Sequence, residues 1–499
     1  MLLHLLQSVH PPSFLFGLVV LLLWALKVLD VVVKAPKWRM AVTRIRDTYL
    51  RHKYLINGAV LIEKSYATAK GIPFVIHTPG RSNTMVTTDF HIRELDKAPR
   101  SVLSLHAVAK EFLQPKHTMH GFEWKDQRGI EGTGFVRAIR ELLTSRLPQL
   151  VPKLSLTISK TLNAEKSNAK VSGGWHRLSL FSTAKHIVTA VNCAVFFPPE
   201  LAENREFLRA ALDFPEDVFL ASEIIQLLPH CIAGALAKLA TRNHRSATAF
   251  YDFLYPVVQR RMKEHSDSSA LGEQHDDGIQ WLIQTTPKRE TWSTERLVGE
   301  IMAVWYGSLH TLAIASTNAL IDLYSHPEYI QPLRAEVEST QYDAFKRSSE
   351  GLPELDSFLK ESARLSAFES TGIRRQALDD FRFSDGLLIP KGSWVCVPHR
   401  AMMRDEKHFP HARHFDGRRF LKPEDKGLSH HSDSWLVWGA GRIVCPGRFY
   451  ATVVLKLVIS LFLTEYDCEL EPINGFTYVQ WRTALIPKSS ITLRIKSRT

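Results

Sequence analysis

Apolar residues recur at steps of three and four along much of the chain, the pattern of helices that bury one face. The segments 135–162, 208–239 and 293–325 follow this pattern. Ser293 is suited to cap the third of these helices, and Pro327 stops it. At about 1.5 Å per residue this helix is roughly 50 Å long, enough to cross a whole domain.

Strand-like segments are short and few. Residues 73–77 form one, and residues 386–398 form another with a turn at Pro390–Gly392. The polar run 265–277 reads as an exposed loop. Together these segments predict a mainly α fold with small β-sheets. Residues 35–499 contain no stretch that resembles a flexible linker, so we expect them to form one domain.

The N-terminus has a different pattern, because residues 14–26 are uninterrupted apolar sequence that continues with few breaks to Val33. A membrane span needs roughly 20 such residues. Basic residues follow the run and none precedes it, which places the rest of the chain on the cytoplasmic side and disfavours a cleaved signal peptide. We therefore predict a membrane anchor over residues 1–34, with a buried N-terminal helix as the alternative.

Composition narrows the class of protein. The chain of 499 residues is 45% hydrophobic and 23% charged, with a formal net charge of +12 that is dispersed along the sequence. Dispersed basic residues disfavour a nucleic-acid-binding tail and fit an acidic protein partner or an anionic membrane. The five cysteines are odd in number and widely spaced, which argues against a disulfide framework or a structural zinc site.

The centre of the long predicted helix breaks its apolar pattern with Gly307-Ser308-Leu309-His310-Thr311. Small and polar residues inside a long buried helix often mark a functional site. The alternative is that His310 is a core residue whose ring nitrogens are hydrogen-bonded and that Thr311 bonds to the backbone of its own helix.

The segment 438–450 carries the strongest chemical signal. Gly439 and Gly441 allow a tight turn close to a flat ligand, and Pro446 suits the first turn of the apolar helix that follows. Cys445 thus precedes a helix and has Arg442 and Arg448 nearby, which favours the thiolate. Such a thiolate is a suitable axial ligand for haem iron.

This segment resembles the cysteine-ligand loop of the cytochrome P450 family, Phe-Gly-x-Gly-x-Arg-x-Cys-x-Gly. The resemblance implies that Cys445 binds the iron of haem b, and that Trp438, Gly439, Arg442 and Gly447 belong to the cofactor loop. Trp438 stands where the family has Phe.

Two further segments follow the family's order. Glu361 and Arg364 match its ExxR motif, and residues three apart share a helix face, so their charges can pair. The segment 415–420 resembles the Phe-x-Pro-x-Arg-Phe segment, with Gly417 in place of Pro. The resemblance implies that Arg419 joins the pair and that the trio maintains the haem pocket.

The broken helix centre resembles the family's oxygen-activation segment, (Ala/Gly)-Gly-x-(Asp/Glu)-Thr. The resemblance implies that Thr311 steers protons and a water to dioxygen. His310 stands where the family has an acidic residue, and a histidine can still relay protons. His310-Thr311 and Cys-Pro-Gly-Arg-Phe are similar to variants in filamentous-fungal members of secondary metabolism.

The residues that bind the haem propionates are less defined. Ile443 occupies the position where the family has Arg or His, so Arg442 is one substitute. Arg374, after the ExxR helix, and Arg140 are further candidates. The Trp124–Arg128 segment matches the family's WxxxR by letters, although its glycine-rich surroundings make a poor helix.

The resemblance implies a haem-thiolate monooxygenase that hydroxylates an apolar secondary metabolite, such as a terpenoid, a polyketide or a polyketide–amino acid hybrid. Electrons would come from NADPH through a separate reductase, and the enzyme would lie in the endoplasmic reticulum membrane facing the cytoplasm. The alternatives are a haem-thiolate ring expansion, desaturation or oxygen-independent isomerisation or dehydration. A zinc module on His408, His411 and His414 is disfavoured, because nothing completes a tetrahedral site.

Overall fold

The computed structural model describes residues 38–122, 133–266, 275–286, 292–422, 424–432 and 434–498. The predicted anchor at 1–34 and the Trp124–Arg128 segment lie outside these ranges, so the anchor and the boundary after residue 34 stay predictions. Within the described ranges one helix, Thr294–Ser325, is long and apolar enough to cross a membrane. Most of its apolar window is buried inside the fold, as expected of a core helix.

Helices form most of the described chain, as the apolar pattern predicts. They are α3 (Trp38–Ala69), α4 (Asp89–Lys97), α5 (Leu105–Leu113), α6 (Pro115–Thr118), α7 (Thr133–Arg137), a π-helical stretch (Ala138–Leu143), α8 (Thr144–Asn168), α9 (Leu180–Phe196), α10 (Pro199–Ala202), α11 (Arg205–Leu227), α12 (His230–Ala240), α13 (Arg245–Ser266), α14 (Gly278–Gln284), α15 (Thr294–Ser325), α16 (Ile330–Val337), α17 (Thr340–Ser348), α18 (Pro353–Leu365), α19 (His399–Met402) and α20 (Arg448–Glu465), with 3-10 turns at Pro327–Tyr329 and Gly441–Ile443.

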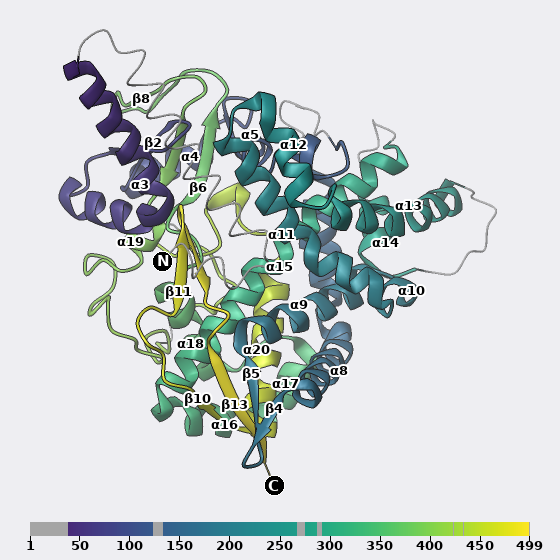
Figure 1. The fold of residues 1–499 in the computed structure, drawn as a ribbon. Helices are drawn as coiled ribbons and strands as arrows, with labels where there is room; N and C mark the ends of the chain where they lie inside the picture. Colours follow the sequence, from purple (N-terminus) through teal and green to yellow (C-terminus); the bar gives the residue numbers. More distant parts are fainter. Residues whose placement is uncertain are drawn as a thin grey trace.

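The long helix α15 begins and ends where the sequence predicts. The Ser293 side chain accepts a hydrogen bond from the Arg296 backbone N–H at 3.2 Å, which caps the first turn. Figure 1 shows α15 passing through the middle of the molecule, with α9 and α20 beside it. The Trp305 indole donates to the Ala211 carbonyl of α11 at 2.7 Å, so α15 is also bonded to α11.

Strands form small sheets. They are β1 (Phe74–His77), β2 (Ser82–Met85), β3 (Leu103–Ser104), β4 (Lys170–Ser172), β5 (Trp175–Ser179), β6 (Gly372–Ala377), β7 (Phe381–Arg382), β8 (Leu388–Ile389), β9 (Trp394–Val397), β10 (Tyr466–Leu470), β11 (Tyr478–Trp481), β12 (Ala484–Pro487) and β13 (Thr492–Ser497). The largest sheet has the order β1-β2-β9-β6-β3, and a second has the order β10-β13-β5-β4. The β2–β9 pair is parallel, and the other pairs are antiparallel.

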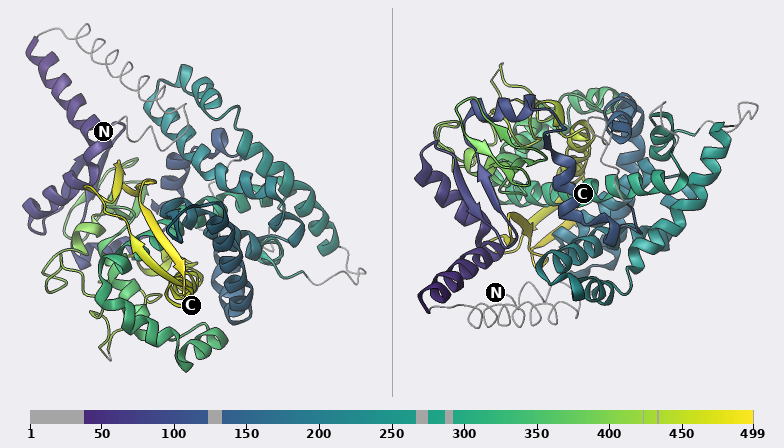
Figure 2. Two further views of the ribbon diagram at one scale, coloured as in Figure 1. Left: turned by 60° about the horizontal axis from the view of Figure 1, so that its bottom comes forward. Right: turned by 90° about the horizontal axis from the view of Figure 1, so that it is seen from above.

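The five-stranded sheet and α3 lie on one side of the molecule, and α13 and α14 lie on the other (Figures 1 and 2). The predicted mainly α fold with small sheets is therefore confirmed. Residues 208–239, which carry one continuous apolar pattern, form two helices that break at Leu228–Pro229. The final long helix begins at Arg448, so Cys445 lies in the turn before it.

Candidate active site

Cys445 lies in a loop whose backbone folds back on itself. The Cys445 N–H donates to the Trp438 carbonyl at 2.8 Å, and the Trp438 indole donates to the Leu428 carbonyl at 2.6 Å. Gly439 has a φ of +86°, and a Cβ there would lie 3.3 Å from the Ile443 carbonyl oxygen. Glycine is therefore required at the point where the loop turns.

A second glycine lets this loop dock on α4. A Cβ on Gly441 would overlap the Asp96 carboxylate, which accepts a hydrogen bond from the Arg442 backbone N–H at 2.8 Å. The Arg442 guanidinium donates to the carbonyls of Asp96 and Lys97 at 2.9 and 3.0 Å, near the end of α4. Arg442 thus anchors the loop to α4, and its contact with a haem propionate stays a prediction.

Cys445 is half-buried, and the backbone N–H groups of Gly447 and Arg448 lie close to its sulfur. Burial raises the pKa of the thiol, while these two N–H groups and the Arg448 charge act in the opposite direction. The effect of burial on the pKa of Cys445 is therefore larger than the effect of the nearby cations that the sequence predicts. A coordinated metal ion would supply the missing positive charge and deprotonate the thiol.

The structure brings Glu361, Arg364 and Arg419 together. The Arg364 Nε and Nη2 atoms donate to the two Glu361 oxygens at 2.7 and 2.8 Å, and both side chains have an exposed fraction of 0%. Arg419 Nε donates to the same carboxylate at 3.1 Å. The remaining Arg364 donors reach the carbonyls of Met403 and Ala412, so α18 holds the long segment that precedes the cysteine loop.

The middle of α15 has one open face inside an otherwise buried helix. Gly307 and Thr311, four residues apart and therefore on one face, are both exposed. A Cβ added to Gly307 would meet no atom within 4 Å. Because α15 crosses the interior, this face borders an internal space.

Thr311 and His310 differ from neighbouring polar residues in this helix. Ser316 and Thr317 each donate to the carbonyl four residues earlier, at 2.9 and 2.7 Å, whereas the Thr311 hydroxyl has no hydrogen-bond partner among the described residues. The alternative in which Thr311 bonds to its own helix is therefore wrong. Burial lowers the pKa of His310 to about 4, so its ring is neutral near pH 7.

Two adjacent arginines in β6 have different surroundings. Arg374, one of the three arginines predicted to bind a propionate, pairs with Glu369. Arg375 has an exposed fraction of 3%, and within the described ranges its guanidinium pairs with no carboxylate and donates only to the Arg374 carbonyl at 2.8 Å. Burial lowers the pKa of Arg375 to about 10. The buried positions of β6 alternate, and this alternation is the sequence signal that could have identified Arg375.

The third predicted arginine lies near the cysteine loop. Arg140 is exposed on the π-helical stretch, and its charge lowers the pKa of Arg448 after the larger effect of burial. A Cβ on Gly447 would lie 3.9 Å from the neighbouring Ile139 side chain. The structure therefore places the stretch that carries Arg140 against the loop that carries Cys445.

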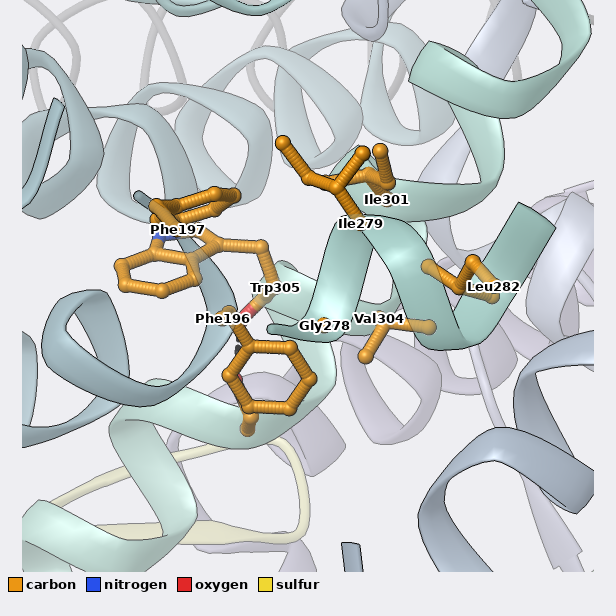
Figure 3. A pocket seen from close by; sticks show the side chains of 9 residues that line it. Phe196, Phe197, Gly278, Ile279, Leu282, Ile301, Val304 and Trp305 are labelled. Carbon is orange, nitrogen blue, oxygen red and sulfur yellow. Dashed lines mark hydrogen bonds between the residues drawn. The ribbon is translucent and has the colours of Figure 1, made fainter. Parts of the chain in front are cut away.

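A narrow apolar cavity lies beside a different stripe of α15. Figure 3 shows aromatic and aliphatic side chains around it from the end of α9, from α14 and from α15. Val304 and Ser308 line it, whereas Gly307 and Thr311 do not. This cavity is distinct from the open face of α15.

The model of the family "Cytochrome P450" matches residues 120–492, so the chain belongs to the cytochrome P450 family. It is an oxidoreductase of that family, as its motifs predict.

Known relatives agree with this assignment. The chain is 27% identical over 429 residues to the cytochrome P450 monooxygenase ptmQ of Penicillium ochrochloron. The aligned region covers 82% of this chain and 81% of that protein. It is 29% identical over 424 residues to the cytochrome P450 monooxygenase 151 of Postia placenta, with coverage of 81% and 82%. A solved structure of a retinoic acid-bound cyanobacterial CYP120A1 shares the fold, with a TM-score of 0.68, 16% identity and coverage of 89% of this chain and 97% of that one.

The residues present fit the haem that the family implies. Cys445 offers a sulfur in a loop shaped by glycines, and the open face of α15 offers space for a flat group. Arg375 is a buried cation without a carboxylate partner among the described residues, as an anionic propionate would require. Cys445 would hold the iron, and Arg375 is the residue that sequence reasoning missed.

Proposed function

We propose that this chain is a membrane-anchored haem-thiolate monooxygenase that hydroxylates an unactivated C–H bond of an apolar secondary metabolite. Haem held by the Cys445 thiolate would supply the activation of dioxygen. The observation that carries the proposal is the Thr311 hydroxyl on the open face of α15, which has no hydrogen-bond partner in the part of the chain that the structure describes. A purely structural threonine in a helix would bond to the preceding turn, as Thr317 does.

Thr311 and His310 would have different roles in proton transfer. The Thr311 Oγ1 can hold a proton or a water at the open face, because its own helix does not occupy it. The neutral His310 ring can accept a proton near pH 7 and pass it on. This assignment favours oxygen chemistry over the oxygen-independent isomerisation or dehydration, which needs no such hydroxyl.

The electrons would come from NADPH through a separate reductase. The segment around Cys445 carries the exposed Arg442 and the half-buried Arg448. The π-helical stretch packed against it carries the exposed Arg140. A basic surface of this kind favours an acidic electron-transfer partner.

The proposed location is the endoplasmic reticulum membrane, with the catalytic domain on the cytoplasmic side. Support comes from the apolar run 14–26 and from the basic residues that follow it, namely Lys34, Lys37 and Arg39. The substrate class rests on the resemblance of the His310-Thr311 and Cys445–Phe449 segments to those of filamentous-fungal members of secondary metabolism.

The test measures how oxygen consumption is coupled to product. Full-length enzyme, NADPH and reductase are incubated with a library of terpenoid and polyketide metabolites, and NADPH oxidation, peroxide and oxygenated product are quantified together. We expect Thr311→Ala to keep consuming NADPH while at least about tenfold less product forms per NADPH, as for loss of a proton-transfer group.

Thr317→Ala is the matched control, because it removes a buried hydroxyl six residues further along the same helix and should leave the coupling unchanged. Equal coupling in wild type and Thr311→Ala would contradict the role of Thr311. A product formed equally well without dioxygen would contradict the monooxygenase.

A further inference from the structure

A cluster of buried polar residues lies beside the open face of α15, one turn before His310. Tyr306 is half-buried next to Gly307. The pKa of its hydroxyl is raised above its ordinary value, mainly by burial and further by the carboxylates of Glu223 and Glu369. Glu223 belongs to α11, and Glu369 precedes β6, so segments far apart in the sequence bring two acids near this tyrosine.

Each acid has its own arginine. Arg482, in the turn between β11 and β12, donates from Nε to a Glu223 oxygen at 2.9 Å. Arg374 pairs with Glu369. Two carboxylates and two guanidinium groups balance, so this cluster carries no net charge.

The two acids differ in how their oxygens are satisfied. Thr483 and Arg374 both donate to Oε2 of Glu369. Glu223 has an exposed fraction of 2%, and its Oε1 atom is buried without a hydrogen-bond partner among the described residues. The Tyr306 hydroxyl likewise has no partner in those ranges. Buried polar atoms of native proteins are nearly always paired, so the unpaired Glu223 oxygen suggests a binding site, and the Tyr306 hydroxyl lies within electrostatic range of the same carboxylate.

The backbone around Arg482 keeps this acceptor open. The Arg482 N–H donates to the Leu55 carbonyl of α3 at 2.6 Å, and a Cβ on Gly58 would lie 2.2 Å from the Arg482 carbonyl oxygen. The turn is therefore packed directly on α3. Arg482, fixed in this position with a φ of +51°, reaches Glu223 through a single hydrogen bond and leaves Oε1 open.

We propose that Tyr306 and Glu223 bind a neutral hydrogen-bond donor of the substrate, a hydroxyl or N–H group on an otherwise apolar skeleton. The inference rests on the proposed oxidation of an apolar molecule and adds how that molecule is recognised. An open acceptor selects a donor, and the charge balance of the cluster disfavours a carboxylate or an ammonium group. Only a group that enters the interior of the fold can reach the buried oxygen.

The position of this site also predicts where oxidation occurs. Tyr306 and Thr311 are five residues apart in one helix, which corresponds to roughly 7.5 Å along its axis and about 140° around it. A substrate held by its donor at Tyr306 therefore presents a carbon several bonds away to the region of Thr311. Oxidation should occur at an apolar carbon remote from the hydroxyl or N–H group.

The test is an optical binding titration of the full-length haem-loaded enzyme with three molecules on one skeleton: farnesol, farnesyl methyl ether and farnesoic acid. The alcohol alone combines a donor with zero charge. We expect wild type to bind farnesol at least about tenfold more tightly than the ether or the acid, the magnitude of one buried hydrogen bond to a charged group. Tyr306→Phe removes only the hydroxyl, and the pair Glu223→Met with Arg482→Met removes the acceptor without leaving a buried charge. In both variants the preference should fall below threefold.

Tyr255→Phe is the matched control, because it removes a tyrosine hydroxyl that bonds to a glutamate at the surface, Glu295 at 3.0 Å. It should keep the wild-type preference. The reduced, carbon-monoxide-bound spectrum of every variant verifies the haem-thiolate site, and a wild type without that spectrum would overturn the proposed function itself. With the spectrum intact, three results would each overturn this inference alone: equal binding of alcohol and ether, a preference that survives both variants, or no binding of any of the three molecules.

Discussion

Around Glu361 the buried polar atoms are bonded to one another, whereas on the open face of α15 two hydroxyls have no partner among the described residues. The Glu361 carboxylate receives Arg364 at both oxygens, Arg419 at one of them and the Asp416 N–H at 3.0 Å. On the open face of α15, the hydroxyls of Thr311 and Tyr306 have no partner among the described residues. Both regions are interior, and they differ in what their polar groups are bonded to.

This difference separates stability from function. A satisfied buried network fixes the chain around it, and losing one member leaves others unpaired. A hydroxyl on an open interior face that has no protein partner is available to a ligand or a water. The comparison predicts that substitutions near Glu361 affect folding, whereas those near Thr311 affect binding and turnover.

The largest effect should come from Arg364→Ala. It leaves the buried Glu361 carboxylate without its bidentate partner and frees the carbonyls of Met403 and Ala412. We expect the free energy of unfolding to fall by about 3–5 kcal/mol, together with loss of bound haem. Urea denaturation and haem content measure both.

The control for this prediction is Arg418→Ala. Arg418 is the neighbour of Arg419 and forms an exposed ion pair with Glu354 at 3.1 Å. Exposed pairs contribute about 0–1 kcal/mol, so this variant should keep its haem and nearly all its stability. Similar losses in both variants would remove the distinction between the two regions.

The next effect concerns pH and His310. Its pKa in the folded protein is about 4, below the ordinary 6.5, so the unfolded chain takes up a proton first as pH falls. The contribution of His310 to stability is complete above pH 6.5 and is lost as pH falls towards 4. Between pH 7 and 5 wild type should lose about 2 kcal/mol more than His310→Asn. Denaturation at both pH values measures this, and parallel losses would contradict a buried, neutral His310.

The smallest effect should come from removing the Thr311 hydroxyl of α15. Thr311→Ala breaks no hydrogen bond within the described chain, so the free energy of unfolding should change by no more than about 0.5 kcal/mol. Thr317→Ala removes a buried bond to the Ala313 carbonyl and should cost about 1 kcal/mol. Thermal unfolding of the two variants compares them directly, and a larger loss at Thr311 would show that its hydroxyl has a structural partner.

The parts of the fold that depend on local sequence were predictable. The helix over residues 293–325, its Ser293 cap and the strand within 73–77 follow from periodicity and capping, and the structure confirms them. The motif around Cys445 and the Glu361–Arg364 pair were also visible in the sequence, because each fixes residue types at short spacings, whereas the place of Arg419 followed from the family resemblance.

Features that depend on packing between distant segments could not be read from the sequence. Arg374 and Arg375 are neighbours of the same type, and only the approach of Glu369 decides which of them remains without a carboxylate. Arg442 binds α4 because Gly441 lets Asp96 approach. The open oxygen of Glu223 arises because the turn at Arg482 is held against α3.

The most direct test of the central claim is the absorption spectrum of the reduced, carbon-monoxide-bound enzyme beside that of Cys445→Ser. If Cys445 is the axial ligand, wild type shows the long-wavelength Soret band of a thiolate-ligated haem and the variant loses it. A folded wild type that binds no haem, or a variant with the same spectrum as wild type, would contradict the assignment of Cys445 and the function built on it.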